Sequence, residues 1–312
     1  MSVGMKVSFL VVETGILILG LLGNGFIGLV NCIEWVKTGK VSSADFILTS
    51  LAVARIIHLG VILFDSYIMV FCPHLLATSK LLKVVTILWV LTNHLTTWFA
   101  TCLSIFYFLK IANFSQSFFN WLKWRVDRVV LVIFMGSFSS LSLNLLVQDG
   151  LSELWINVYS VPERNMTSLF DGSKISYLKG LFIVSLTYVI PFFLSLISLL
   201  LLYLSLVRHS KNLHLNLKDS RDSSTVAHRR AIRMVTTFIV LFIIYFISIL
   251  TGSWIFTKIQ TYQANMPVLV ISTIFPSGHS FIIILGNSKL RQIALNLLWH
   301  LNSLRKSKPF TL

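Results

Sequence analysis

The sequence predicts an all-α membrane protein, a seven-transmembrane helix bundle with an extracellular amino terminus. Of its 312 residues, 55% are hydrophobic and 12% are charged, and the mean hydropathy is +0.82. These values are too apolar for a soluble domain of this length. The chain also contains seven apolar runs that reach the roughly 20 residues needed to cross a bilayer. No segment between them is long enough to form another unit, so we expect a single domain, 1–312.

The apolar runs place the spans along the chain. We expect them at about 7–30, 46–71, 84–109, 129–148, 180–207, 232–256 and 266–286. After the seventh run, leucine and isoleucine recur at helical spacing between basic residues that include Lys289, Arg291 and Arg305. This pattern predicts a short amphipathic helix, about 288–304, on the membrane surface.

Basic residues predict the orientation of the bundle. The first, third and fifth inter-span segments and the carboxyl-terminal tail together carry 18 Lys and Arg residues, and the opposite side carries 7. Because cytoplasmic loops are enriched in Lys and Arg, the amino terminus should lie outside. The formal net charge of +15 is then concentrated at the cytoplasmic face. We expect anionic membrane lipids and acidic protein surfaces as partners, and no nucleic acid.

The second span contains a basic residue, Arg55, at mid-membrane depth. Such residues are costly in hydrocarbon and usually face the bundle interior. The acid Asp65 is ten residues further on, about 15 Å away. Arg55 should therefore bond to neutral groups, with Asn24 in the first span and Ser280 or backbone carbonyls in the seventh as candidates. Such a polar contact between helices could hold the fold together or could switch between two arrangements of the bundle. Asp65, near the outer end, could contact water or a ligand.

The third span carries a polar stripe. Its members recur at three- and four-residue steps and share one helix face: Thr86, Trp89, Asn93, Thr96, Thr97, Ala100, Ser104 and Tyr107. Asparagine and threonine need hydrogen-bond partners in hydrocarbon, so this face should look into the bundle. Small and hydroxylated members could simply allow close packing, whereas Trp89 and Asn93 could line a pocket near the outer end.

The segment between spans four and five contains the sequon Asn165-Met166-Thr167. It lies on the predicted outer side, so we expect Asn165 to be glycosylated. On the opposite side, the basic segment 208–233 contains His209 and His228. It could be a lipid-attracted linker or a docking surface, and the sequence favours neither.

Two prolines, Pro191 and Pro276, should kink spans five and seven. Beside Pro276, the polar run 277–280 includes His279 and raises the question of catalysis. No acid is placed to orient the imidazole, no G-x-S-x-G elbow is present and no metal-ligand spacing accompanies it. We therefore expect no enzyme activity, metal or cofactor, and expect His279 to bond to neighbouring helices.

Short motifs along the whole chain resemble those of the type 2 taste receptors, the bitter receptors among G-protein-coupled receptors. The third span ends in 106–110, FYFLK, where rhodopsin-like receptors have Asp-Arg-Tyr, and span six lacks their Cys-Trp-x-Pro hinge. The matching motifs are Gly23-Asn24-Gly25-Phe26-Ile27, Leu29-Val30-Asn31-Cys32, Leu51-Ala52-Val53-Ala54-Arg55, FYFLKIANFS from Phe106 to Ser115, Leu202-x-x-Ser205-Leu206, Ala227-His228, His279-Ser280-Phe281 and Leu285-Gly286-Asn287-Ser288-Lys289-Leu290-Arg291.

The resemblance implies a multi-pass receptor of the plasma membrane that binds bitter small molecules and activates a heterotrimeric G protein of the gustducin type. Agonists would enter from outside between the upper parts of the spans. Trp89 and Asn93 match the family's ligand-contacting pair, with His94 beside them. Positions added to this ligand site by helix face are Asp65, Thr86, Thr187, Tyr245 and Leu269.

The resemblance also implies an inner signalling region. Tyr107, Lys110, His209 and His228 fall where family members meet the G protein or hold the resting state. Asn24, Arg55, Ser205 and His279 would form a polar core that switches between two arrangements. A small-solute transporter or channel is the alternative. Transporters tend to show internal repeats, and no repeat relates the halves of this chain, so the receptor interpretation is favoured.

Overall fold

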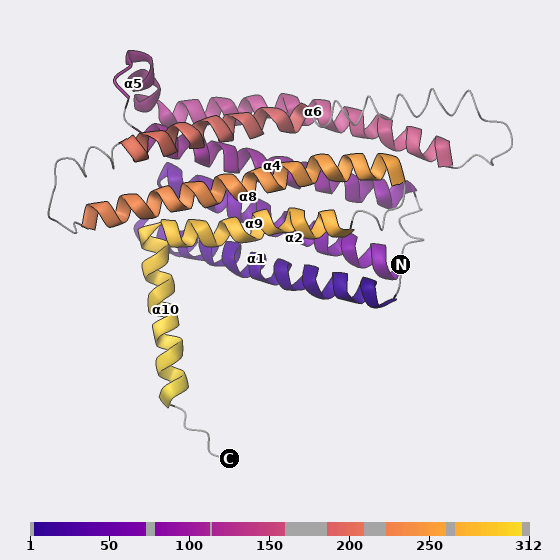
Figure 1. Ribbon diagram of the computed structural model, residues 1–312, viewed down its shortest axis with the longest axis horizontal. Coiled ribbons are helices and arrows are strands. Elements are labelled where there is room, and N and C mark those ends of the chain that lie inside the picture. Colours follow the sequence, from indigo (N-terminus) through magenta and orange to yellow (C-terminus); the bar gives the residue numbers. More distant parts are fainter. Residues whose placement is uncertain are drawn as a thin grey trace.

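The computed structural model describes residues 3–72, 79–112, 114–159, 186–208, 223–259 and 266–307. Asn165 and His209 lie outside these ranges. The long helices are α1 (Val3–Thr38), α2 (Ser43–Phe71), α4 (Ser79–Ile111), α6 (Val126–Tyr159), the unlabelled helix Leu186–Arg208, α8 (Ser223–Ile259) and α9 (Met266–Gly286). They lie side by side as a bundle, and the described residues contain no strand (Figure 1). The all-α membrane bundle predicted from the sequence is confirmed.

Within the described residues, six helices are long and apolar enough to cross a membrane, and α4 is not among them. Its polar stripe lowers its hydropathy. The helix can carry that stripe because it contacts α2 and α6 and is hydrogen-bonded to the helix Leu186–Arg208 and to α8. Polar groups in a span are stable where neighbouring helices supply their partners. We therefore count α4, the predicted third span, as a spanning helix together with the other six.

The first and last spanning helices meet, because α9 packs against α1 as well as against α8. Helices α1 and α9 approach closely at Gly23, where an added Cβ would lie 2.3 Å from the Ser280 hydroxyl oxygen. A glycine removes that side chain and lets the two backbones come together. This contact closes the bundle around α4.

Several helices extend beyond the predicted spans. Helix α1 covers Val3–Thr38 rather than 7–30, and α6 covers Val126–Tyr159 rather than 129–148. An apolar run reports only the part of a helix inside hydrocarbon, and the helix can continue into the head-group region. A short helix, α5 (Ser117–Trp124), follows α4 and was not predicted.

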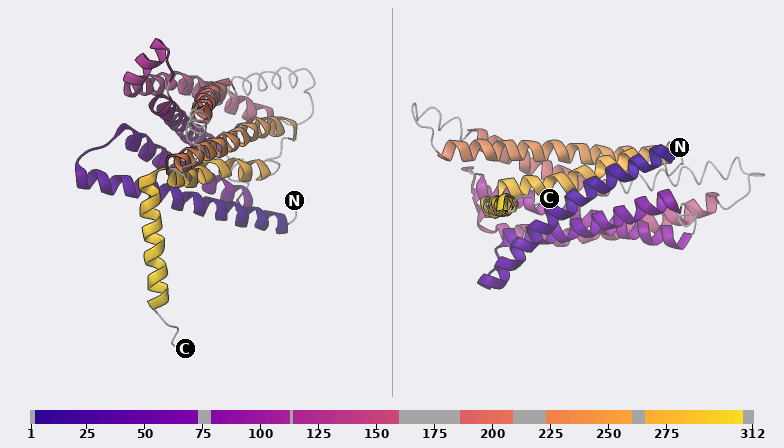
Figure 2. Two further views of the ribbon diagram at one scale, coloured as in Figure 1. Left: turned by 60° about the vertical axis from the view of Figure 1, so that its left-hand side comes forward. Right: turned by 90° about the horizontal axis from the view of Figure 1, so that it is seen from below.

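The predicted surface helix is present as α10 (Ser288–Ser307). The side-chain oxygen of Asn287 accepts hydrogen bonds from the backbone N–H groups of Lys289 at 3.0 Å and Leu290 at 3.3 Å, which caps its first turn. The helix then runs away from the bundle (Figures 1 and 2). Leu290 is buried against the bundle, whereas Leu297 and Leu298 are exposed. An apolar face left open in this way suits a membrane surface.

Candidate functional site

The polar stripe of α4 faces the bundle interior, as its spacing predicted. Asn93 is fully buried, and the side chains of Thr86, Trp89 and Tyr107 are half-buried. The remaining members, Thr96, Thr97, Ala100 and Ser104, are also buried. The side chains of the stripe can therefore be followed from the outer end of the bundle to the inner end, meaning the end expected in the cytoplasm.

In the outer half, Asn93 joins α4 to α8. The Tyr245 hydroxyl donates a hydrogen bond to Asn93 Oδ1 and also lies near Thr97. Asn93 Nδ2 makes no hydrogen bond of normal geometry among the described residues, although the side chain is fully buried and lies near the Tyr188 hydroxyl. An amide carries two donors and an acceptor, so one contact leaves Asn93 with donors available to another group.

Trp89 lies one turn above Asn93, beside the helix Leu186–Arg208. Its ring packs against Tyr188, and its centroid is 6.1 Å from that of His58. Asn144 Nδ2 of α6 donates to the Tyr188 hydroxyl at 3.2 Å and to Thr187 Oγ1 at 3.1 Å. Tyr188 and Asn144 were not predicted from the sequence. A lone asparagine in the apolar fourth span was the available signal.

Other predicted ligand positions lie in different seams of the bundle. His94 Nε2 is 3.2 Å from Ser137 Oγ of α6, so its ring points toward a different neighbour from that of Asn93. Leu269 packs with Phe9, Leu10 and Met69 where α1, α2 and α9 meet. Asp65 is buried on α2.

Glu13, in the outer part of α1, is fully buried in the bundle. Its Oε2 accepts a hydrogen bond from Thr273 Oγ1 at 3.4 Å. This contact joins α1 to α9 in the outer half and was not expected from the sequence.

At mid-membrane depth, Arg55 joins α2 to α9. Its Nη2 is 2.5 Å from His279 Nδ1, and its guanidinium carbon is 5.4 Å from the Phe275 ring centroid. Arginine can only donate, so Nδ1 must accept and the imidazole proton lies on Nε2. The expected polar lock is present with a neutral partner, but that partner is His279.

The groups expected to bond to Arg55 have other partners. Asn24 Nδ2 donates to the backbone carbonyls of Gly20 at 2.8 Å and Pro276 at 3.3 Å. The Ser280 hydroxyl donates to the Ser277 carbonyl at 2.6 Å. Asn24 therefore ties α1 to α9, beside the contact that Arg55 makes.

Aromatic rings connect the Asn93–Tyr245 contact to the Arg55–His279 contact. Tyr245 stacks on Phe275 with centroids 4.9 Å apart, and Phe275 stacks on His279 at 5.4 Å. Phe238 of α8 lies 4.1 Å from His279. Contact is therefore continuous from Asn93 in the outer half to His279 in the middle.

Below His279, a cavity of about 410 Å³ opens toward the inner end of the bundle. It lies between α4, the helix Leu186–Arg208, α8 and α9, and Tyr107, Phe238 and His279 line it. Ser205 is half-buried on the same helix as the lining residues Leu202 and Leu206. Lys110 is exposed at the inner end of α4, and His228 lies on the first turns of α8.

Comparison with known proteins agrees with this architecture. Residues 1–302 match the family model described as taste receptor protein (TAS2R). Taste receptor type 2 member 42 of Papio hamadryas is 50% identical over 93% of this chain and 92% of its own, and the human protein of that name is 48% identical over 96% of both. Taste receptor type 2 member 7 of Macaca mulatta is 43% identical over 93% of this chain and 92% of its own. The chain belongs to the type 2 taste receptor family, the G-protein-coupled receptors for bitter compounds.

Proposed function

We propose that this receptor binds bitter small molecules in the outer half of its bundle, around Trp89, Asn93 and Tyr245. The proposal rests on the continuous contact from Asn93 through Tyr245, Phe275 and His279 to the inner cavity. Asn93 has donors to spare, and Trp89 offers a half-buried aromatic surface beside it. A few polar anchors within apolar walls are typical of small-molecule sites. Thr86 and Thr187 are the nearest further candidates along these helices.

Agonist binding would act on the contact between Asn93 and Tyr245. A ligand that donates a hydrogen bond to Asn93 Oδ1 competes with the Tyr245 hydroxyl for that oxygen, and Nδ2 can donate to an acceptor on the same ligand. Release of Tyr245 changes its stacking on Phe275, and through Phe275 the position of His279. A ligand shifts a two-state equilibrium only by its difference in affinity for the two states. The agonist must therefore favour the arrangement in which Tyr245 has moved.

The inner cavity is the proposed docking place for a heterotrimeric G protein of the gustducin type. Tyr107 and His279 line the cavity, and exposed Lys110, Arg208 and Arg233 lie on the helices around it. These cations favour a partner with an acidic surface. His209 and His228 of the basic segment remain candidates for this contact, and the site lies at the cytoplasmic face of the plasma membrane.

A calcium assay in transfected cells tests the proposal. Cells that express the receptor with a gustducin-type α subunit are exposed to a panel of bitter compounds, and matched cells lack either the receptor or the α subunit. At least one compound should raise calcium only when both proteins are present. Silence across the panel, with receptor verified at the cell surface, would contradict the proposal. Solute flux through the purified receptor in liposomes would instead support a transporter.

A further inference from the structure

A second cavity, of about 480 Å³, lies on the outside of the bundle between α1, α2 and α4. Its wall is mostly apolar and includes Trp35, Phe46, Val53, Ile57, Leu95 and Phe99. Four of these side chains, Trp35, Phe46, Val53 and Ile57, are 48–62% exposed on the bundle surface. Because the chain spans a membrane, this groove opens to lipid. It is separate from the cavity below His279 and shares no lining residue with it.

One polar side chain in the groove wall has no hydrogen-bond partner. Asn31 of α1 lines the groove and is 5% exposed, yet neither its Oδ1 nor its Nδ2 is bonded within the described residues. A buried amide without partners costs about 1–3 kcal/mol. A molecule in the groove that can both donate and accept would offset that cost. A hydroxyl group meets this requirement.

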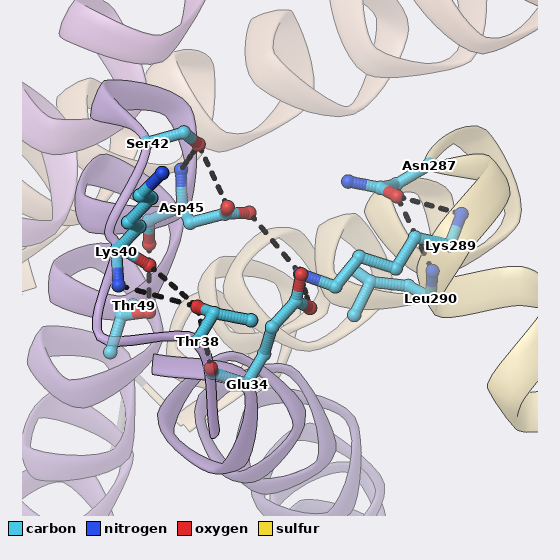
Figure 3. Close-up of polar contacts among 9 residues, drawn as sticks. All are labelled: Glu34, Thr38, Lys40, Ser42, Asp45, Thr49, Asn287, Lys289 and Leu290. Atoms are coloured by element: carbon cyan, nitrogen blue, oxygen red, sulfur yellow. Dashed lines mark hydrogen bonds and ion pairs between the residues drawn. The ribbon is translucent and has the colours of Figure 1, made fainter. Parts of the chain in front are cut away.

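The mouth of the groove lies at the inner membrane surface and carries no net charge. Glu34, Lys40 and Asp45 line it, and Lys289 of α10 forms ion pairs with both acids (Figure 3). Two carboxylates are thus matched by two ammonium groups. The charges paired at the mouth itself therefore favour a neutral head group, although the cytoplasmic face as a whole is basic.

The depth of the groove matches one leaflet. From Asp45 at the mouth to Ile57 at its deep end, α2 advances twelve residues, about 18 Å. Half of a bilayer's hydrocarbon core is about 15 Å. Asn31 lies one turn deeper than Glu34 along α1, near the polar end of any lipid oriented with its head group at the inner surface.

We propose that this groove is a binding site for a sterol of the inner leaflet, with the sterol hydroxyl bonded to the Asn31 amide. The ring system would lie against Val53, Ile57, Leu95 and Phe99. The β-branched and aromatic residues in this wall have few side-chain rotamers, so they suit a rigid flat molecule better than a flexible acyl chain. A sterol is also neutral and has one hydroxyl, as the mouth and Asn31 require.

Photolabelling of the full-length receptor tests the assignment. Purified receptor is reconstituted into phosphatidylcholine nanodiscs with a photoreactive cholesterol analogue that keeps its 3β-hydroxyl, and labelled peptides are mapped by mass spectrometry. Label should concentrate on residues 31–57 and 95–99. The variant Val53→Trp fills the groove from its exposed side and should lower this label at least fivefold. Val132→Trp, at an exposed position of α6 outside the groove, should leave it unchanged.

The hydrogen bond to Asn31 is tested separately. Asn31→Leu should weaken labelling about fivefold, as expected for loss of one hydrogen bond. Unlabelled cholesterol should compete better than its 3α-hydroxyl epimer in the wild type and equally well in this variant. If Asn31→Leu does not reach wild-type surface levels, the comparison of Val53→Trp with Val132→Trp tests the sterol site by itself. Label outside the groove, or label insensitive to Val53→Trp, would overturn the sterol assignment.

Discussion

The Tyr245–Asn93 contact in the outer half of the bundle and the Arg55–His279 contact at mid-membrane depth differ in what their loss would cost. In the outer half, Tyr245 and Asn93 are both neutral, and each can exchange its partner for water or a ligand. At mid-membrane depth, Arg55 is a cation with no exposed surface, and His279 is its hydrogen-bonding partner. A buried charge that loses its partner is far more costly than a neutral group. The outer contact therefore suits a replaceable ligand site, and the deeper one suits a lock between helices.

The largest effect should come from His279→Leu. This change leaves the Arg55 cation buried beside an apolar side chain, and we expect a loss of about 3 kcal/mol in stability. Thermal unfolding of detergent-solubilised receptor and its surface level measure the loss. In the double variant Arg55→Met with His279→Leu, the charge is gone as well, so stability should partly recover. If the single variant were no less stable than the double, the contact would not act as a charged lock.

Disturbing the packing between α1 and α9 should cost less stability than leaving the Arg55 charge without a partner, but more than breaking an exposed contact. Gly23→Ala places a Cβ 2.3 Å from Ser280 Oγ and 3.1 Å from Ser280 Cβ, and that hydroxyl is held by the Ser277 carbonyl. Overpacking of this kind costs about 1–3 kcal/mol. Gly28→Ala is the matched control, since nothing lies within 4 Å of its added Cβ. Equal unfolding temperatures for the two variants would show that α1 and α9 can separate freely at this position.

The sequence predicted the parts of this arrangement that depend on one helix at a time. Apolar runs located the spans because hydrocarbon thickness sets their length. The spacing of Asn93, Thr97 and Ser104 identified the interior face of α4, because residues three and four apart share a side. Arg55 was recognised as an interior residue because a charge in hydrocarbon requires protein neighbours.

Partners between helices could not be predicted in the same way. Neighbouring residues point about 100° apart around a helix, so the rotation of α9 about its own axis decides whether His279 or Ser280 meets Arg55. The same geometry turns His94 toward Ser137 although it adjoins Asn93. Rotation and axial offset depend on packing among all the helices, which periodicity within one helix does not encode. Asn144 and Tyr188 were missed for that reason.

Two substitutions in the outer contact should change agonist potency in opposite directions. Asn93→Ala removes the proposed ligand anchor and should raise the EC50 about tenfold, the equivalent of one hydrogen bond of about 1.4 kcal/mol. Tyr245→Phe leaves Asn93 Oδ1 without its competing hydroxyl and should lower the EC50 about fivefold. Calcium responses at matched surface levels measure both. Unchanged potency of every agonist in both variants would remove this pair from the ligand site.

The smallest effect should come from the ion pairs at the inner surface. Lys289 bonds to Glu34 and lies 3.7 Å from Asp45, but its side chain is 29% exposed and that of Glu34 is 43% exposed (Figure 3). Solvent screens such pairs, and exposed ion pairs contribute under about 1 kcal/mol. Lys289→Gln should therefore lower the unfolding temperature slightly in low salt and not at all in high salt. A loss as large as that of His279→Leu, independent of salt, would mean that depth in the membrane does not determine the strength of these contacts.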